Sequence, residues 1–595
     1  MARRVAIVVL RNDLRIHDHA LFHSVHTPKS KGITHVLPVY VFDERFVELS
    51  GLPDYQRSGP EARTRLFGFW RTGVFRARFL TEAVYDLRDN LRSKGSDLLI
   101  RFGKLENVLE QVVDSLKSDG DIVERTLYNL DFCSEELTIE RRINTAMESR
   151  GVQVETHDTT PLSPDLPFPV AQTPDVFTPF RKRVEGLGFL GRAPLNMPSK
   201  FKPFPVLSSG PYPGYGSKFD GCNVDDIVDL LLKPLEDTFE IKYKHASTPR
   251  DSKSAFPYAG GESSALNRLK FYFKDGNPPP VAKYKATRNG LLGHEYSTKL
   301  SPFLCLGMIS PRLIMQALDE HEQEFGETQN TYWVRFELLW RDYFLYMARK
   351  FGAKLFTLGG FEEVTDPKQA QMKSQPGWWR GWDREAGQDD VVTKWLTGRT
   401  GVPFIDANMA ELRESGFMSN RGRQNVASFL TKDLQVDWRI GAEYFESHLI
   451  DYEPTANYGN WQYVGGVGND PRASRQFNPI KQANDYDPQG RYIKTWIPQL
   501  SKVPSTRIQC PWTLSKQDFE KLIGSPEVYP TRPVIEQGSW KPHYIKKGSG
   551  KLNGNKNERA RNPGPGGNKA GHTGPQNATN SQPDKEGARA KSRQS

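Results

Sequence analysis

Cysteine is scarce in this chain. Its 595 residues include only four cysteines, and these lie far apart, at positions 133, 222, 305 and 510. Such spacing forms neither a CxxC metal-binding motif nor a disulfide framework. We therefore predict no metal site, and the cysteine content favours a reducing compartment.

Long hydrophobic runs are also missing. No window approaches the ~18 consecutive apolar residues that cross a bilayer, so no membrane association is predicted. The first apolar run, residues 5–10, is too short for a signal-peptide core and leads directly into a charged loop. Arg3 and Arg4 stand directly before this run, so no signal or transit peptide is apparent. The expected location is the cytoplasm or the nucleus.

Net charge is almost absent from the body of the chain. Of the total of +10, residues 541–595 carry 12 basic and 3 acidic side chains, which leaves 69 basic and 68 acidic ones elsewhere. A nucleic-acid-binding surface on the body must therefore be a local patch. The tail is rich in Gly, Asn, Lys and Pro, a composition typical of disorder. It is either a solubilising extension or an auxiliary contact for RNA or other nucleic acid.

The first part of the chain has the rhythm of an α/β domain. Short apolar runs at residues 5–10, 35–42, 98–102, 126–129 and 152–156 read as strands, and segments 79–92 and 105–116 read as helices between them. This alternation predicts a doubly wound parallel sheet. The first strand leads into RNDLRIHDHAL, without a glycine-rich phosphate loop, so a Rossmann dehydrogenase is disfavoured.

Composition divides the chain into four predicted segments. An α/β domain spans residues 1–160, and a Pro/Gly-rich connector that runs over the surface spans residues 161–224. Long amphipathic patterns without strand signals predict one large helical domain at residues 225–530. The basic tail spans residues 531–595.

Two patterns in the helical domain suggest chemistry, and each also has a purely structural interpretation. Trp333, Glu337, Trp340 and Phe344 share one helix face, which places a carboxylate among apolar residues. Glu337 is either a functional group with a raised pKa or half of a helical ion pair with Arg341. Residues 297–302, STKLSP, suit either a diphosphate at a helix start or an ordinary N-cap.

Five ordered motifs resolve part of this ambiguity. They are Tyr284 with Arg288, STKLSPFLCLGMISPR, FELLWRDYF, GRTGVPFIDANM and the run from NRGRQN through NYGNWQY to VGGVGND. With these motifs the chain resembles the photolyase/cryptochrome family over roughly residues 5–500, and the last run is similar to the DASH branch. The resemblance implies FAD in the helical domain.

The resemblance also implies which residues hold FAD. Tyr284 and Ser297, Thr298, Lys299, Leu300 and Ser301 would hold its phosphates, and Glu337, Arg341 and Asn420 would line its pocket. Arg423 and Asp451 would form an ion pair against the isoalloxazine, with Glu453 at the flavin edge. The neutral amide of Asn457 would face flavin N5, where a carboxylate would repel negative charge on the ring.

Three tryptophans would conduct electrons to the flavin in this family. Trp461 would be nearest, followed by Trp438 and then Trp382, although packing in the core is the usual role of a buried tryptophan. The segment between Trp382 and Trp395 is about three residues longer than the family pattern.

The implied activity is light-driven repair of cyclobutane pyrimidine dimers by reduced FAD. Glu337 would hydrogen-bond the dimer, and Trp340, Gln424 and Tyr463 would line its site. Gln424 and Tyr463 stand where many photolyases have Met and Trp. A smaller aromatic wall stacks less well on a flipped dimer, so we expect a monomeric enzyme that prefers single-stranded DNA.

Other features leave alternatives open. The resemblance implies an antenna, most often 5,10-methenyltetrahydrofolate, and Asp131 stands where an acidic folate contact, usually Glu, is expected. The same flavin and tryptophans would equally serve a blue-light photoreceptor that signals without repair. A flavoprotein with no light-driven role is the remaining alternative.

Overall fold

The structure is a computed structural model that describes residues 2–188, 191–235, 253–361, 367–375, 377–470 and 476–544. Residues 1–546 form one compact unit. The second unit, residues 547–595, lies outside the described residues, as does most of the predicted tail.

A five-stranded parallel sheet forms the N-terminal part, as predicted. Its strands are β1 (Arg4–Leu10), β2 (His35–Asp43), β3 (Leu99–Gly103), β4 (Ile122–Asn129) and β5 (Gln153–His157), in the order β3-β2-β1-β4-β5. In the central register, Ile7 lies opposite Leu37 on one side and Thr126 on the other. Each strand overlaps the apolar run that predicted it. The central strands β1 and β2 are almost fully buried and nearly continuous in hydrophobic residues, whereas the edge strand β5 is only partly buried.

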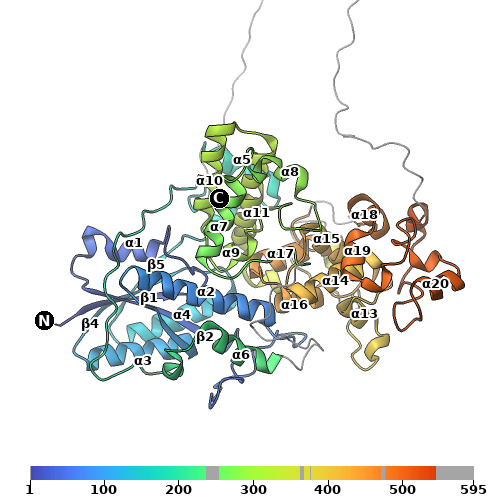
Figure 1. Cartoon of the computed structure of the whole chain (residues 1–595). Coiled ribbons are helices and arrows are strands. Elements are labelled where there is room, and N and C mark those ends of the chain that lie inside the picture. The colour runs from blue at the N-terminus through green and yellow to red at the C-terminus, as the bar shows by residue number, and fades with distance from the viewer. Residues whose placement is uncertain are drawn as a thin grey trace, which may run out of the picture. The chain divides into compact units, whose positions relative to one another are not determined.

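Alternating side chains of β1 enter two different cores. Val5, Ile7 and Val9 pack with helices α3 (Leu105–Ser118) and α4 (Ser134–Glu148). Ala6, Val8 and Leu10 pack with helices α1 (Ala20–His26) and α2 (Val74–Ser93) and with part of the helical region. Figure 1 shows the blue strands among these helices. The sheet is therefore doubly wound, and one of its faces supports the helical region.

The connector contains a helix that was not predicted. Helix α5 (Phe177–Glu185) buries Phe177, Phe180 and Val184, so this part of the chain is anchored in the core instead of merely lying over the surface. The i, i+3 and i+7 spacing of these residues is a helical signal, masked by the surrounding Pro and Gly. Helix α6 (Val224–Leu232) begins where the connector was expected to end.

The remaining described part of the chain is helical, as expected. Its helices are α7 (Glu262–Phe273), α8 (Tyr284–Thr287), α9 (Ser301–Cys305), α10 (Pro311–Phe325), α11 (Gln329–Phe351), α12 (Pro367–Ser374), α13 (Val391–Thr397), α14 (Pro403–Ser415), α15 (Asn420–Ser428), α16 (Trp438–His448), α17 (Pro454–Gly465), α18 (Pro479–Tyr486), α19 (Arg491–Trp496) and α20 (Lys516–Leu522). Within the described ranges, no helix is long and apolar enough to cross a membrane.

The first residues of the predicted tail belong to the folded body. Trp540, in the 3-10 helix η11 (Gly538–His543), is 1% exposed and its ring lies 6.2 Å from that of Phe429. The backbone N–H of Val534 donates to the carbonyl of Thr400 at 2.8 Å. The boundary at residue 531 was therefore too early, because one buried tryptophan outweighs a polar local composition.

Helix α11 is tied to the start of the connector by a buried carboxylate. The backbone N–H groups of Leu162 and Ser163 donate to Asp342 at 2.9 and 2.8 Å. Burial raises the pKa of Asp342 to about 6. This contact fixes the helix that carries Glu337 and Arg341.

We expect Asp342→Ala to lower the free energy of unfolding by about 2–5 kcal/mol, because two buried N–H groups lose their acceptor. Urea denaturation followed by circular dichroism measures this change. Glu324→Ala, at an exposed site on α10, is the control and should leave the midpoint unchanged. Equal stability of the two variants would show that the contact does not anchor α11.

Candidate functional site

One large cavity of about 710 Å³ opens in the helical region. This volume falls in the range of pockets that enclose organic ligands. All the predicted FAD and substrate residues line it: Tyr284, Ser297, Thr298, Lys299, Leu300, Ser301, Glu337, Trp340, Arg341, Asn420, Arg423, Gln424, Asp451, Glu453, Asn457 and Tyr463, together with Trp461. Five separate stretches of sequence thus meet around one space, although the role of each residue stays a prediction.

Lys299 places a buried amine in the wall of this pocket. Its side chain is 2% exposed, and its Nζ has no hydrogen-bond partner among the described residues. The Nζ lies 3.4 Å from the ring centroid of Tyr296 and 4.4 Å from that of Phe417. Burial lowers the pKa of Lys299 well below its usual value. An amine buried in the pocket wall without a hydrogen-bond partner would regain its positive charge beside an anion such as the diphosphate of FAD.

The backbone at Lys299 is also unusual. Its φ of 58° lies in the left-handed region, which a residue with a side chain adopts at some cost. Helix α9 begins two residues later, at Ser301. Strain of this kind is common where a chain must present its backbone to a ligand. The N-cap of α9 is Leu300 and no side chain caps the helix, so an ordinary side-chain N-cap is not formed, and the contact with a diphosphate stays a prediction.

An ion pair forms another wall. Arg423 on α15 donates to the two carboxylate oxygens of Asp451 at 2.9 and 2.8 Å, as predicted. Ser301 Oγ donates to the same carboxylate at 2.7 Å. The Asp451 side chain is 2% exposed, so its charge is compensated by Arg423 and not by water.

Asn457 lies on α17 and is 8% exposed. Its Nδ2 donates to the carbonyl of Ala442 on α16 at 3.0 Å. This bond holds the amide in one orientation and leaves its oxygen free to accept.

Glu337 and Arg341 do not pair with each other, so the helical ion-pair interpretation was wrong. Glu337 pairs with Arg288, and Arg341 donates to Glu453 at 2.7 Å. Both partners come from other segments of the chain. A side chain that faces a cavity reaches charged groups on the opposite wall, and it pairs with them instead of with a neighbour on its own helix. Loss of hydration in the pocket wall raises the pKa of Glu337, although the charge of Arg288 opposes this shift.

The wall beside Glu337 is aromatic. Trp340 stacks on Phe177 of α5 with ring centroids 3.7 Å apart and planes at 12°. Tyr463 meets the Trp340 ring edge-on at 5.9 Å. Gln424 accepts a hydrogen bond from Arg421 at 2.9 Å. The unpredicted helix α5 thus supports the predicted substrate wall.

Among the described residues, no ring contact joins the three predicted electron-transfer tryptophans directly to one another. Trp461 contacts Phe445 at 5.1 Å and Trp395 at 6.3 Å, whereas Trp438 contacts Tyr458 at 6.2 Å. Trp438 and Trp382 lie outside the cavity lining. Trp461 packs against Gly441, on the same helix as Trp438.

A continuous row of rings instead joins Trp461 to Trp382 through residues that the sequence did not indicate. From Trp395 it passes to Tyr444 at 6.0 Å, to Phe69 at 5.5 Å and to Trp382 at 5.4 Å. Phe69 belongs to the N-terminal part of the chain. Trp395 was visible as a tryptophan near the GRTGVPFIDANM motif, but nothing in its spacing separated it from a core residue.

Asp131 lies in a cluster of acidic groups near β4. Arg11 Nη1 is 3.3 Å from its carboxylate, and burial raises the pKa of Asp131. Burial also raises the pKa of nearby Glu136 to about 7. The negative charge of Glu453 also contributes to the raised pKa of Asp131.

Gly441 offers a direct test of the position of Trp461. A Cβ at this site would fall 2.1 Å from Trp461 Cη2, so Gly441→Ala must displace the indole. We expect the free energy of unfolding to fall by about 1–3 kcal/mol, as in other overpacked cores. We also expect slower photoreduction of the bound flavin, measured from its absorption under blue light.

Gly221→Ala is the control for that experiment, because a Cβ there meets nothing within 4 Å. Unchanged stability and photoreduction in Gly441→Ala would contradict the packing of Trp461 against α16.

Comparisons with known proteins agree with this geometry. A family model described as DNA photolyase matches residues 6–199, and one described as the FAD binding domain of DNA photolyase matches residues 333–546. The latter domain begins in α11 and includes the Arg423–Asp451 pair. The chain therefore carries an FAD-binding domain of the photolyase type.

Curated relatives match most of the chain. It is 42% identical to Cryptochrome DASH of Xenopus laevis, with 92% of each chain covered, and 41% identical to that of Danio rerio, with 92% and 94% covered. A Neurospora crassa protein named putative cryptochrome DASH, mitochondrial, is 36% identical, with 91% of this chain and 77% of the relative covered.

Solved structures show the same fold. A Synechocystis cryptochrome is 35% identical and superposes with a TM-score of 0.75, covering 91% of this chain and 99% of its own. A class III photolyase of Agrobacterium tumefaciens, 22% identical with a TM-score of 0.67, covers 91% and 97% and supports the fold alone. With both photolyase domains in order and this identity along nearly the whole chain, the protein belongs to the cryptochrome DASH branch of the photolyase/cryptochrome family.

Proposed function

We propose that this protein repairs cyclobutane pyrimidine dimers, preferentially in single-stranded DNA. The observation that carries this proposal is the position of Glu337. Its carboxyl lines the same cavity as the Arg423–Asp451 pair and Lys299, so one pocket offers both flavin contacts and a hydrogen-bonding group for a substrate.

The pocket residues suit FAD at both ends. Lys299 and the backbone of residues 297–301 would hold the diphosphate, because the buried Nζ of Lys299 needs an anion. The Arg423–Asp451 pair and Asn457 would hold the ring system. Held by these residues, reduced FAD would supply light-driven one-electron transfer to the substrate, with no net redox change.

Glu337 would stabilise the negative charge that develops on the dimer when it gains an electron. The raised pKa of the Glu337 carboxyl favours its protonated form, which can donate a hydrogen bond to a dimer carbonyl. That bond strengthens when the dimer gains an electron, so it favours the reacting state over the bound one. Arg288, the present partner of Glu337, would then be free to contact a DNA phosphate.

The aromatic wall supports a preference for single strands. Tyr463 presents a smaller ring than a tryptophan would, and it meets Trp340 only edge-on. Weak stacking offers less energy to extract a dimer from a duplex, whereas a single strand largely avoids that cost of a few kcal/mol.

Electron supply and light harvesting are further parts of the proposal. Trp461, Trp438 and Trp382 would pass electrons from the surface to the flavin. The Asp131 cluster would contact 5,10-methenyltetrahydrofolate as an antenna. Its support is the carboxyl of Asp131, which is partly exposed and held beside Arg11.

A blue-light photoreceptor is the second candidate function. The row of rings from Trp461 to Trp382 favours it, because a route from the pocket to a partly exposed tryptophan serves photoreduction, which repair by flavin already reduced does not need. A monomeric state and a location in the cytoplasm or nucleus remain predictions for both functions.

Glu337→Gln separates the two functions. We expect a roughly two- to tenfold lower yield of repaired thymine dimers per absorbed photon, because an amide stabilises the developing negative charge less well than a protonated carboxyl. The assay uses reduced protein, a single-stranded oligonucleotide with one dimer, and blue light. Flavin content and photoreduction should equal those of the wild type.

Glu324→Gln, at an exposed glutamate on α10, is the control. Repair by Glu337→Gln at the wild-type yield would remove Glu337 from the mechanism. Absence of repair in the wild type itself would leave the photoreceptor function.

A further inference from the structure

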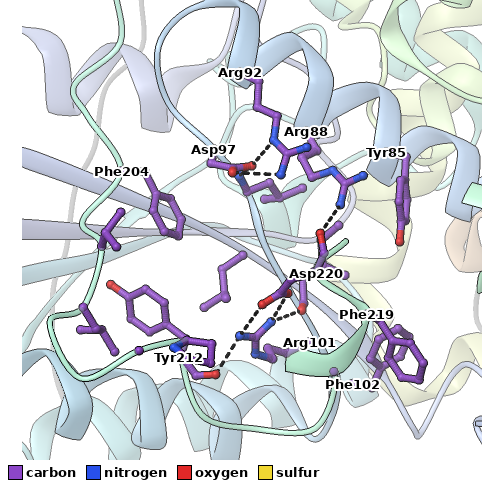
Figure 2. Close-up of a pocket in the computed structure, with 18 residues that line it drawn as sticks. Tyr85, Arg88, Arg92, Asp97, Arg101, Phe102, Phe204, Tyr212, Phe219 and Asp220 are labelled. Carbon is purple, nitrogen blue, oxygen red and sulfur yellow. Dashed lines mark hydrogen bonds and ion pairs between the residues drawn. The ribbon is translucent and has the colours of Figure 1, made fainter. Parts of the chain in front are cut away.

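A second cavity lies at the edge of the sheet, away from the flavin pocket. It has a volume of about 180 Å³ and lies between β3, the C-terminal half of α2 and the connector around residues 204–220. None of its lining residues lines the larger pocket. Figure 2 shows Phe204 and Tyr212 on one side and Arg88 and Tyr85 on the other.

Arg101 holds the connector against the sheet at this cavity. Its side chain is fully buried and donates to the carbonyls of Ile100, Tyr212 and Pro213 and to the carboxylate of Asp220. Every donor nitrogen of this guanidinium is used, and its charge is neutralised by Asp220. Arg101 therefore has a structural role, because it fastens the connector to β3.

A second arginine at the cavity is also paired. Arg92 lies near the opening and pairs with Asp97 at 2.9 Å. The side chains of these two residues are 47% and 33% exposed, so water screens the pair. Neither Arg92 nor Arg101 needs a further anion.

Arg88 has no such compensation. It is 8% exposed, and no carboxylate lies within 4.0 Å of its guanidinium in the described part of the chain. Its Nη1 is 3.5 Å from the carbonyl oxygen of Asp220, its Nε is buried without a partner, and its guanidinium lies 4.2 Å from the Tyr85 ring centroid. A buried charge with so few partners is costly unless an anion joins it.

The connector closes the cavity tightly on one side. Gly216 has a φ of 122°, and a Cβ there would fall 2.8 Å from Phe102 Cδ2. The chain can approach the strand this closely only because the residue is glycine. Asp220 follows four residues later. Its ion pair with Arg101 and the close approach of Gly216 to Phe102 together fix the walls of the cavity.

We propose that this cavity binds a small aromatic carboxylate with a single ring. One uncompensated arginine calls for one negative charge, and a carboxylate binds a guanidinium through short, charge-assisted hydrogen bonds. Phe204 and Tyr212, whose rings meet edge-on at 5.8 Å, offer a surface for a ring.

The volume limits the size of the ligand. An engineered cavity of about 150 Å³ accommodates benzene, so a space of about 180 Å³ suits one ring with a carboxylate. A flavin or a complete folate is too large, because pockets for such ligands begin at about 300 Å³. This site is therefore distinct from an antenna site and does not rest on the proposed function.

Benzoate is the first probe. It is titrated into the full-length, flavin-loaded protein and followed by saturation-transfer NMR and calorimetry. We expect saturable binding that becomes at least ~10-fold weaker in Arg88→Gln, because the charge-assisted hydrogen bonds are lost. Arg78→Gln, on the same helix but outside the cavity lining, should bind benzoate like the wild type.

Two further probes separate the ring from the charge. Benzamide has the same shape without the charge, and inorganic phosphate has charge without a ring; both should bind at least ~10-fold more weakly than benzoate. These measurements use wild-type protein, so they remain decisive even if Arg88→Gln does not fold.

Three outcomes would overturn the proposal. They are no saturable binding of benzoate up to about 10 mM, equal affinity in the wild type and folded Arg88→Gln, and benzamide or phosphate binding as tightly as benzoate. Tight phosphate binding would identify a simple anion site instead.

Discussion

The carboxylate of Asp451 is the interaction on which the flavin pocket depends. It joins Arg423 of α15 and Ser301 of α9, at 2.8 and 2.7 Å, to the segment that leads into α17. Because its side chain is 2% exposed, its charge cannot be supported by water. The same pair therefore sets both the shape of the pocket and its electrostatic field, and loss of either partner would leave a buried charge alone.

The remaining charged groups follow the same arrangement. Arg341 pairs with Glu453 and Glu337 pairs with Arg288, whereas Lys299 is an ionisable side chain of the described pocket wall whose Nζ has no hydrogen-bonding partner. Carboxylates and guanidiniums thus neutralise one another in the pocket wall, whereas the amine of Lys299 has no such partner. This distribution suits a ligand with a localised negative charge.

Local patterns were sufficient to predict much of the molecule. The β1 run alternates between two cores, so its continuous hydrophobicity was a valid sign of a buried parallel strand. The helix period in α11 correctly placed Glu337 and Trp340 on one cavity-facing surface. The site segments were recognisable because motifs that bind one ligand must keep their order and residue types.

Long-range partners could not be read from sequence in the same way. Glu337 pairs with Arg288, and the ring of Phe69 lies between those of Tyr444 and Trp382. Both sets of contacts join segments that are far apart in the chain. Helix α5 and Trp540 were missed because their neighbours are rich in Pro, Gly and charge. In each case tertiary packing outweighed local composition.

The most direct test of the central claim is a comparison of dimer repair in matched single-stranded and duplex oligonucleotides by the reduced wild-type protein under blue light. We expect light-dependent loss of the dimer, at least ~10-fold faster in the single strand, because extrusion from a duplex costs a few kcal/mol. Equal rates on both substrates would contradict the role given to the Tyr463 wall, and no repair on either substrate would contradict the enzyme function.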